Sequence, residues 1–310
     1  MSLVLLVVGV VLLYIGGEGL VRGASALGRH FGVSSIVIGL TIVSMGTSSP
    51  ELAATLAGVL QGAPAVSFGN VVGSNIANLG LVLGLTALIW PLDIAARFIR
   101  REMPVMLAVS AATFVIVIDG VIGRLEGLLL LVALIGYLRS LMVSDEKPEI
   151  EAEFERAYGE ESRSIWGSVI AVVVGIALLV LGAQVLIKGA VGLARFMDIS
   201  ERVIGLTMVA FGTSLPELAS CVVAAMRREG DLVLGNLIGS NIFNILFILG
   251  TTATIQPLPV QTRAVWPDLI VMMFVSLLAW ILLRTGWRLA RREGLLLMAT
   301  YFAYLIYLFF

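Results

Sequence analysis

Apolar stretches follow one another along almost the whole chain. Each has about 20 residues, which is enough to cross the roughly 30 Å hydrocarbon core of a bilayer as an α-helix. Only 13% of the residues are charged and the mean hydropathy is +1.04, whereas a soluble domain carries about 25% charged residues. The composition therefore excludes a soluble protein with a large core and predicts an all-α membrane protein.

Ten such stretches are predicted to be transmembrane helices. They lie near residues 2–27, 34–60, 64–89, 99–118, 122–143, 165–193, 200–226, 231–255, 264–283 and 291–309. A polar segment with eight acidic residues, Ser144–Ser164, separates the fifth stretch from the sixth and is predicted to be a solvated linker. The expected domains are a five-helix unit in 1–143, the linker 144–164 and a second five-helix unit in 165–310.

The second half of the chain repeats the first at a constant offset. Val37–Ala53 matches Val203–Ala219 at 13 of 17 positions, and Gly69–Asn78 matches Gly235–Asn244 at 7 of 10. Because each unit holds an odd number of helices, the second copy would enter the membrane from the opposite side. The chain is therefore predicted to contain inverted repeats, an arrangement that many secondary transporters use.

The distribution of basic residues predicts the orientation. With the N-terminus outside, the inward loops hold 15 of the 20 Lys and Arg residues and the outward loops hold 5. The positive-inside rule thus places both termini outside the cell and the acidic linker in the cytoplasm. The net charge of −1 offers no surface for nucleic acid.

Two glutamates lie in the middle of apolar stretches. Between Phe31 and Ala96 the only charged residues are Glu51 and Asp93, and Asp93 lies near a helix end. Glu217 holds the position of Glu51 in the second copy, and neither has a basic residue at helical spacing. Such a charge costs at least ~2.5–3.5 kcal/mol in the membrane and marks a functional site. Each glutamate must therefore be protonated, paired across helices or neutralised by a mobile cation.

The residues around each glutamate supply oxygen atoms. Thr47, Ser48 and Glu51 share one helix face, and Pro50 is expected to free backbone carbonyls one turn earlier, around Gly46 and Ser44. One face of the next helix carries Asn70, Ser74 and Asn78. The second copy offers Ala210, Thr213, Ser214, Pro216 and Glu217, followed by Asn236, Ser240 and Asn244.

These donors are all hard oxygen ligands, and the sequence holds no cluster of Cys or His. Two carboxylates with neutral oxygens suit Ca²⁺, which takes about 6–8 oxygen ligands in irregular geometry. Mg²⁺ ranks lower because it requires octahedral geometry, and Na⁺ would accept the same oxygens. The sequence therefore predicts a transported cation and no cofactor.

The paired motifs resemble those of the cation/calcium exchanger superfamily, in particular its prokaryotic sodium/calcium antiporters. The resemblance rests on Gly46–Glu51 with Gly69–Asn75, and on Gly212–Glu217 with Gly235–Asn241, and it covers the whole chain. It implies a secondary antiporter in the cell membrane that exchanges Ca²⁺ for Na⁺ by alternating access, with no enzymatic activity. The first and sixth helices would slide against the rest, and one copy of the chain would suffice.

The same resemblance implies the ion ligands. Glu51 and Glu217 would be central. The shells would be completed by Thr47, Ser48, Ser74, Asn78, Thr213, Ser214, Ser240 and Asn244 and by the backbone of Ser44 and Ala210.

Two features depart from patterns within that family. Asn244 stands where some members, including potassium-dependent ones, carry an aspartate, so the pooled site has a formal charge of −2 and no K⁺ requirement is expected. Ser49 stands where an aliphatic residue such as Leu215 is usual. Gly73 and Gly239 replace the acidic residue typical of the proton-coupled branch, which favours Na⁺ over H⁺ as the counter-ion.

Three other functions compete with a sodium-coupled antiporter. A proton-coupled Ca²⁺ exchanger would use the same oxygens. A cation channel is less favoured because a channel usually builds its pore around a subunit axis, whereas this chain completes a site by itself. A serine hydrolase would need a base, and the only histidine, His30, lies in a polar loop.

Three charged residues outside the motifs have simpler explanations. Glu18 is expected to pair with Arg22 four residues later. Asp119 and Asp268 lie near the ends of apolar stretches and are expected to face water.

Overall fold

The computed structural model describes residues 2–143, 164–197 and 212–309. Nearly all of the predicted linker and the first part of the seventh stretch, with Ala210, lie outside these residues.

The described residues form helices joined by short loops and four two-residue strands. The first half comprises α1 (Ser2–Phe31), α2 (Ser35–Ile38), η1 (Gly39–Val43), α3 (Ser44–Thr47), α4 (Ser49–Leu60), α5 (Pro64–Ala77), η2 (Asn78–Leu83), α6 (Gly84–Ile89), β1 (Leu92–Asp93), η3 (Phe98–Glu102), α7 (Met103–Ile116), β2 (Val121–Ile122) and α8 (Arg124–Val143). The second half comprises α10 (Ile165–Phe196), α12 (Leu215–Met226), α13 (Gly230–Phe243), η4 (Asn244–Leu249), α14 (Gly250–Ile255), β3 (Leu258–Pro259), α15 (Thr262–Arg284), β4 (Arg288–Leu289) and α16 (Arg291–Phe309). The elements labelled η are turns of π-helix.

Six helices among the described residues are long and apolar enough to cross a membrane, and the pair Ser35–Thr47 and Ser49–Leu60, bent by 43°, would make a seventh. The prediction of a helical protein that crosses the membrane several times is thereby confirmed. The apolar windows of Pro64–Ile89 and Gly230–Ile255 are 78% and 94% buried, against 28–33% for the other four. These two helices therefore form the centre of the molecule.

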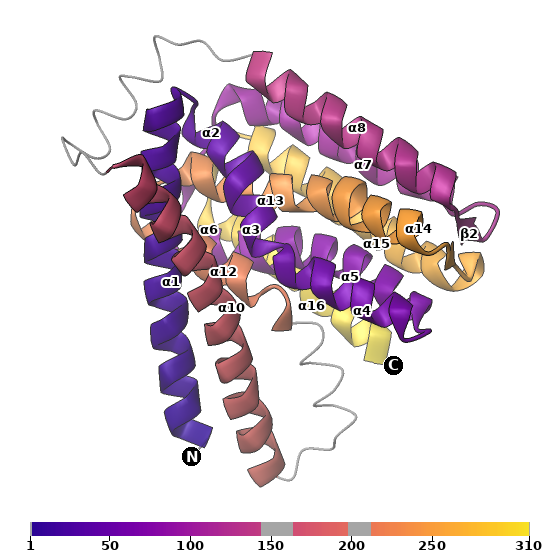
Figure 1. Cartoon of the computed structure of the whole chain (residues 1–310), viewed down its shortest axis with the longest axis horizontal. Coiled ribbons are helices and arrows are strands. Elements are labelled where there is room, and N and C mark those ends of the chain that lie inside the picture. The colour runs from indigo at the N-terminus through magenta and orange to yellow at the C-terminus, as the bar shows by residue number, and fades with distance from the viewer. Residues whose placement is uncertain (1, 144–163, 198–211, 310) are drawn as a thin grey trace.

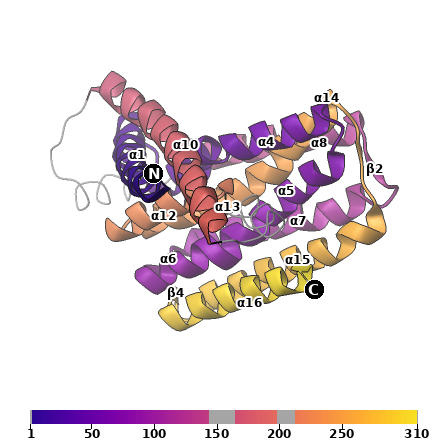
Figure 2. The ribbon, with the colours of Figure 1, turned by 90° about the horizontal axis from the view of Figure 1, so that it is seen from below.

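The long helices α1 and α10 lie side by side in opposite directions at one edge of the molecule (Figure 1), and the other helices stack beside them (Figure 2). Their contact is made by glycines at every seventh position: Gly9, Gly16 and Gly23 on α1, and Gly175, Gly182 and Gly189 on α10. A Cβ atom at Gly175 would lie 2.5 Å from the backbone nitrogen of Leu20. Glycine thus lets the two backbones touch, as in other closely packed membrane helices.

Equivalent elements recur in the two halves at the constant offset that aligns Glu51 with Glu217. The bounds of α4 and α5 correspond to those of α12 and α13, and the π-helical turns η2 and η4 begin at the equivalent residues Asn78 and Asn244. Each strand pairs with a strand of the other half: β1 with β4 and β2 with β3. The two halves are therefore interlocked and do not form separate lobes.

Two equivalent asparagines join the central helices α5 and α13. Asn75 Nδ2 donates to the carbonyl of Asn241, and Asn241 Nδ2 donates to the carbonyl of Asn75, both at 3.3 Å. Such reciprocal bonds are what a two-fold relation between the halves produces where equivalent residues meet.

Two buried carboxylate–tyrosine pairs tie the outer helices together. Tyr137 donates to Glu102 Oε2 at 3.0 Å, and Tyr304 donates to Asp268 Oδ1 at 3.0 Å. Arg97 also contacts Glu102, at 3.1 Å. The expectation that Asp268 faces water holds only in part, because Asp268 is half-buried beside Tyr304. Asp119 is exposed, as expected.

We expect Tyr137→Phe to destabilise the protein by about 1.5–3 kcal/mol, because it removes a hydrogen bond to a buried charged group. Glu102 is fully buried, whereas Asp268 can still reach solvent, so Tyr304→Phe should cost less. Thermal unfolding of both variants in the same detergent measures the difference. A larger loss for Tyr304→Phe would contradict this ranking.

Candidate functional site

The chain breaks its helical path at two equivalent points in the middle of the molecule. Ser48 and Ser214, with φ/ψ of −82°/6° and −86°/3°, precede α4 and α12. Each of these helices has a proline, Pro50 or Pro216, in its first turn, where the missing N–H does no harm. Of the carbonyls around Gly46 and Ser44 that Pro50 is expected to free, that of Ser44 accepts the Ser48 N–H at 3.0 Å and is therefore not freed.

Glu51 and Glu217 lie in the first turns of α4 and α12 and are completely buried. Ser48 Oγ donates to Glu217 Oε1 at 3.1 Å. In the described part of the chain, neither oxygen of Glu51 nor Oε2 of Glu217 has a hydrogen-bond partner. Three buried carboxylate oxygens are thus without a donor from these residues.

Two asparagine side chains present further oxygen atoms. The amide nitrogen of Asn78 donates to Asn241 Oδ1 at 3.2 Å, and that of Asn244 donates to Asn75 Oδ1 at 3.0 Å. These bonds determine which way each amide points. Oδ1 of Asn78 and of Asn244 are buried and accept no hydrogen bond from any described residue.

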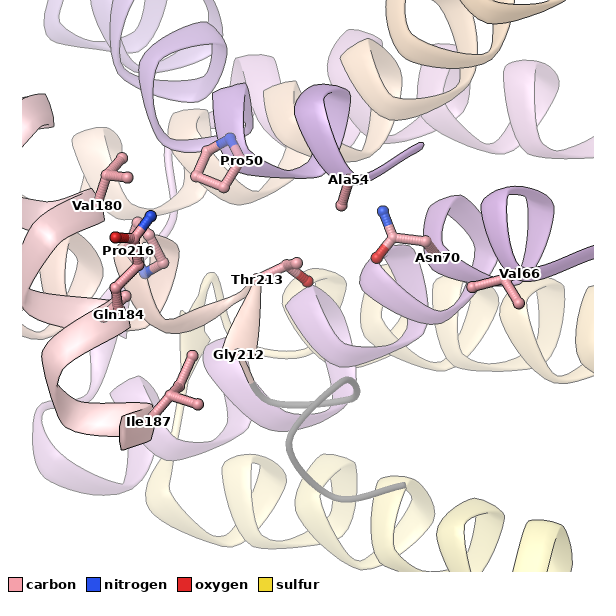
Figure 3. Close-up of a pocket in the computed structure, with 11 residues that line it drawn as sticks. Pro50, Ala54, Val66, Asn70, Val180, Gln184, Ile187, Gly212, Thr213 and Pro216 are labelled. Carbon is pink, nitrogen blue, oxygen red and sulfur yellow. The ribbon is translucent and has the colours of Figure 1, made fainter. Parts of the chain in front are cut away.

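The hydroxyl groups complete the set and differ between the two copies. Thr47 Oγ1 donates to Asn236 Oδ1 at 3.1 Å, and Ser240 Oγ contacts the same oxygen at 3.4 Å. The equivalent Thr213 and Asn70 instead face each other across a cavity (Figure 3). Ser74 is buried, and Ser214 Oγ is buried with no partner among the described residues.

The cavity has a volume of about 390 Å³ and lies between α10 and the residues near Glu51 and Glu217 (Figure 3). Its lining residues are Pro50, Ala54, Val66, Asn70, Val180, Ala183, Gln184, Ile187, Gly212, Thr213 and Pro216. Val66 and Asn70 lie in the half of α5 nearer Pro64, and Ala183, Gln184 and Ile187 lie in the half of α10 nearer Phe196; both of these helix ends are predicted to be extracellular. The cavity also touches Pro50 and Pro216, each next to one of the buried glutamates, and so lies on the predicted extracellular side of the two helix breaks.

The model of the family described as "Sodium/calcium exchanger protein" matches residues 1–143 and 167–310. The chain belongs to this family. It is 37% identical to a putative antiporter, CaxA, of Alkalimonas amylolytica, over 99% of this chain and 98% of the relative. It is 34% identical to the sodium/calcium exchanger MaX1 of Methanosarcina acetivorans, over 100% of this chain and 99% of the relative.

A solved structure of the sodium-calcium exchanger NCX_Mj, soaked with Na⁺ and Ca²⁺, has the same fold. The TM-score is 0.83 at 34% identity, over 98% of this chain and 97% of that chain. The resemblance inferred from the paired motifs is thereby confirmed.

In this member of the exchanger family, most of the predicted ligands meet at the centre. Glu51, Glu217, Ser48, Thr47 and Ser214 gather at the two helix breaks, and Ser74, Asn78, Ser240 and Asn244 lie on α5, η2, α13 and η4 beside them. Ala210 lies outside the described residues. Their roles as ligands remain predictions.

The sequence indicated no ligand role for Asn75 and Asn241, although both belong to the repeated motif. They hold Asn78 and Asn244 in place through the amide bonds described above. Asn75 lies three residues before Asn78, and Asn241 lies three residues before Asn244. This spacing suggests a bond within each helix, but the observed bonds join Asn78 to Asn241 and Asn244 to Asn75, in different halves of the chain. Only the packing of α5 on α13 reveals them.

Proposed function

We propose that this protein exchanges Ca²⁺ for Na⁺ across the membrane at one mid-membrane site that both halves of the chain share. The observation that carries the proposal is Glu51, a fully buried carboxylate with no donor among the described residues. A buried charge without compensation costs several kcal/mol. A cation bound between Glu51 and Glu217 would supply that compensation and would use the unpartnered oxygens of Asn78, Ser214 and Asn244.

The charge of the site suits this exchange. Two glutamates give −2, which one Ca²⁺ or two Na⁺ balance, and the remaining donors are neutral oxygens that both ions accept. The two ions would therefore compete for one set of ligands, which is the physical requirement for antiport.

We further propose that the ten predicted helices form two inverted five-helix repeats, in 1–143 and 165–310, with both termini outside and the linker 144–164 in the cytoplasm. The equivalent elements in the two halves support the repeat. The cavity on one side of the glutamates supports alternating access, because on the opposite side α1 packs closely against α12. A Cβ atom added to Gly17 of α1 would lie only 3.3 Å from the carbonyl oxygen of Ala219 on α12.

Uptake of radiolabelled Ca²⁺ into proteoliposomes tests the proposal. Vesicles loaded with Na⁺ should accumulate Ca²⁺ from a Na⁺-free medium, and vesicles loaded with K⁺ or with equal Na⁺ on both sides should not. Uptake that ignores the Na⁺ gradient and follows a pH gradient would instead establish proton coupling. Uptake with no gradient dependence would indicate a channel.

The packing of α13 against η1 speaks against the proton-coupled alternative. A Cβ atom at Gly239 would lie 2.8 Å from Leu40 Cα, so this position has no room for the acidic side chain typical of that branch.

A further inference from the structure

The side of the molecule opposite the cavity contains a buried ion pair that joins α1 to α12. Arg227, just after the end of α12, contacts Glu18 in the middle of α1 through two nitrogens, with Nε at 2.8 Å from Oε2 and Nη2 on Oε1. Both side chains are largely buried, with 25% and 22% of their surface exposed. Glu18 also pairs with Arg22 of its own helix at 2.7 Å, as the sequence predicts.

The equivalent positions in the other copy carry no charge. At the offset of the repeat, Glu18 corresponds to Gln184 of α10, and Arg227 corresponds to Gln61, just after α4. Gln184 lines the open cavity, and both glutamines are exposed. The two copies therefore differ: one carries Glu18 and Arg227, and the other carries the neutral Gln184 and Gln61 at the equivalent positions.

The same two sides differ in how tightly they are closed. Val66 lines the cavity and is 61% exposed, whereas its equivalent Leu232 is 1% exposed and also packs beside Gly39 of η1, whose equivalent lies outside the described residues. Ala54 and Ala57 of α4 are exposed, whereas their equivalents Ser220 and Val223 on α12 are buried. The side with the ion pair is the closed one.

We propose that Glu18 and Arg227 are positioning residues that latch α1 onto α12 and so hold the inner entrance shut, leaving the resting exchanger open to the outside. This proposal rests on the proposed function, in which α1 and α10 move against the other helices. A two-nitrogen Arg–carboxylate contact is among the stronger polar interactions in proteins, and it must break before α1 can leave α12. At the equivalent outer positions, the neutral Gln61 and Gln184 offer no such contact against the reverse movement.

Labelling of single cysteines with a membrane-impermeant maleimide measures the conformation without transport. Cys221 is first replaced by Thr, the residue that the equivalent position 55 carries. The reporters are Val66→Cys for the outer cavity and Leu232→Cys for the inner entrance. The test variant, Glu18→Gln with Arg227→Gln, copies the neutral pair of the other side.

In the test variant, labelling of Leu232→Cys from the cytoplasmic side should rise at least about tenfold, because both charge-assisted hydrogen bonds between Arg227 and Glu18 are lost from a two-state balance. Labelling of Val66→Cys should fall. Arg22→Gln is the matched control, because Arg22 pairs with Glu18 within α1 and does not join α1 to α12. It should change the labelling of neither reporter by more than about twofold.

Two further variants keep the proposal falsifiable. The exchanged pair Glu18→Arg with Arg227→Glu, made together with Arg22→Gln so that no two arginines lie four residues apart on α1, should restore the labelling of the parent protein if the contact itself matters. Gln184→Glu with Gln61→Arg should place a latch on the outside and lower Val66→Cys labelling. If labelling at both reporters is unchanged in a folded Glu18→Gln, Arg227→Gln protein, the latch is overturned. If labelling shifts as expected but the parent protein does not exchange Na⁺ for Ca²⁺, only the proposed function is overturned.

Discussion

Glu51→Gln is expected to abolish exchange, with a loss of more than about 100-fold in the initial rate of Na⁺-driven Ca²⁺ uptake. Loss of a residue that only supports a metal ligand costs about 10–100-fold, and Glu51 is proposed as a ligand itself. The substitution also lowers the charge of the site from −2 to −1, so that a bound Ca²⁺ would no longer be balanced. Glu217→Gln should have the same effect.

The stability of the same variants separates a lost site from a lost fold. Without ions, Glu51→Gln should unfold at or above the temperature of the parent protein, because it removes a buried carboxylate without a donor among the described residues. Ca²⁺ should raise the unfolding temperature of the parent protein, since binding to the native state stabilises it. It should leave that of Glu51→Gln unchanged.

Ser49→Leu is the matched control within the same motif. Ser49 is exposed and donates to the carbonyl of Met45, and the equivalent residue in the second copy is Leu215. Exchange should therefore persist at the parent rate. Parent-like exchange in both Glu51→Gln and Glu217→Gln would remove these residues from the site.

Gly175→Val is expected to have the largest effect on folding. A Cβ atom at Gly175 would lie 2.5 Å from the nitrogen and 3.0 Å from Cα of Leu20, and backbone cannot rotate away as a side chain can. Overpacking typically costs about 1–3 kcal/mol, and this contact with backbone should reach about 3 kcal/mol or more. Most of the protein should aggregate or unfold on mild heating.

Size-exclusion chromatography of heated samples measures that loss. Gly136→Val on α8 is the matched control, because Gly136 is exposed and has no atom within 4 Å of its Cβ position. Both variants replace a helical glycine by valine, so their helix propensities change equally. Any difference between them therefore reports the contact of α1 with α10. Equal losses in the two variants would show that the approach of α1 to α10 does not decide stability.

The central site could largely be predicted because its residues are local in sequence. The glutamate, the two hydroxyls and the proline lie within one turn, and their repetition in the second half exposes the pattern. The Glu102–Tyr137 and Asp268–Tyr304 pairs could not be found in this way. Glu102 is equivalent to Asp268, but the residue equivalent to Tyr137 is Ala303, which precedes Tyr304. A one-residue change of register conceals such a pair from a search at a single offset.

The sequence by itself determined the membrane helices, the duplication and the residues that meet at the centre, because hydrophobicity and motif spacing are properties of neighbouring residues. Only the tertiary structure decided which oxygens lack donors, how glycines bring α1 onto α10, and that Glu18 pairs with Arg227 as well as with Arg22. The reason is that these contacts join segments far apart in the chain. Two similar copies, moreover, do not reveal which side is open, because that asymmetry arises when α1 closes on α12 and α10 stands away from α4.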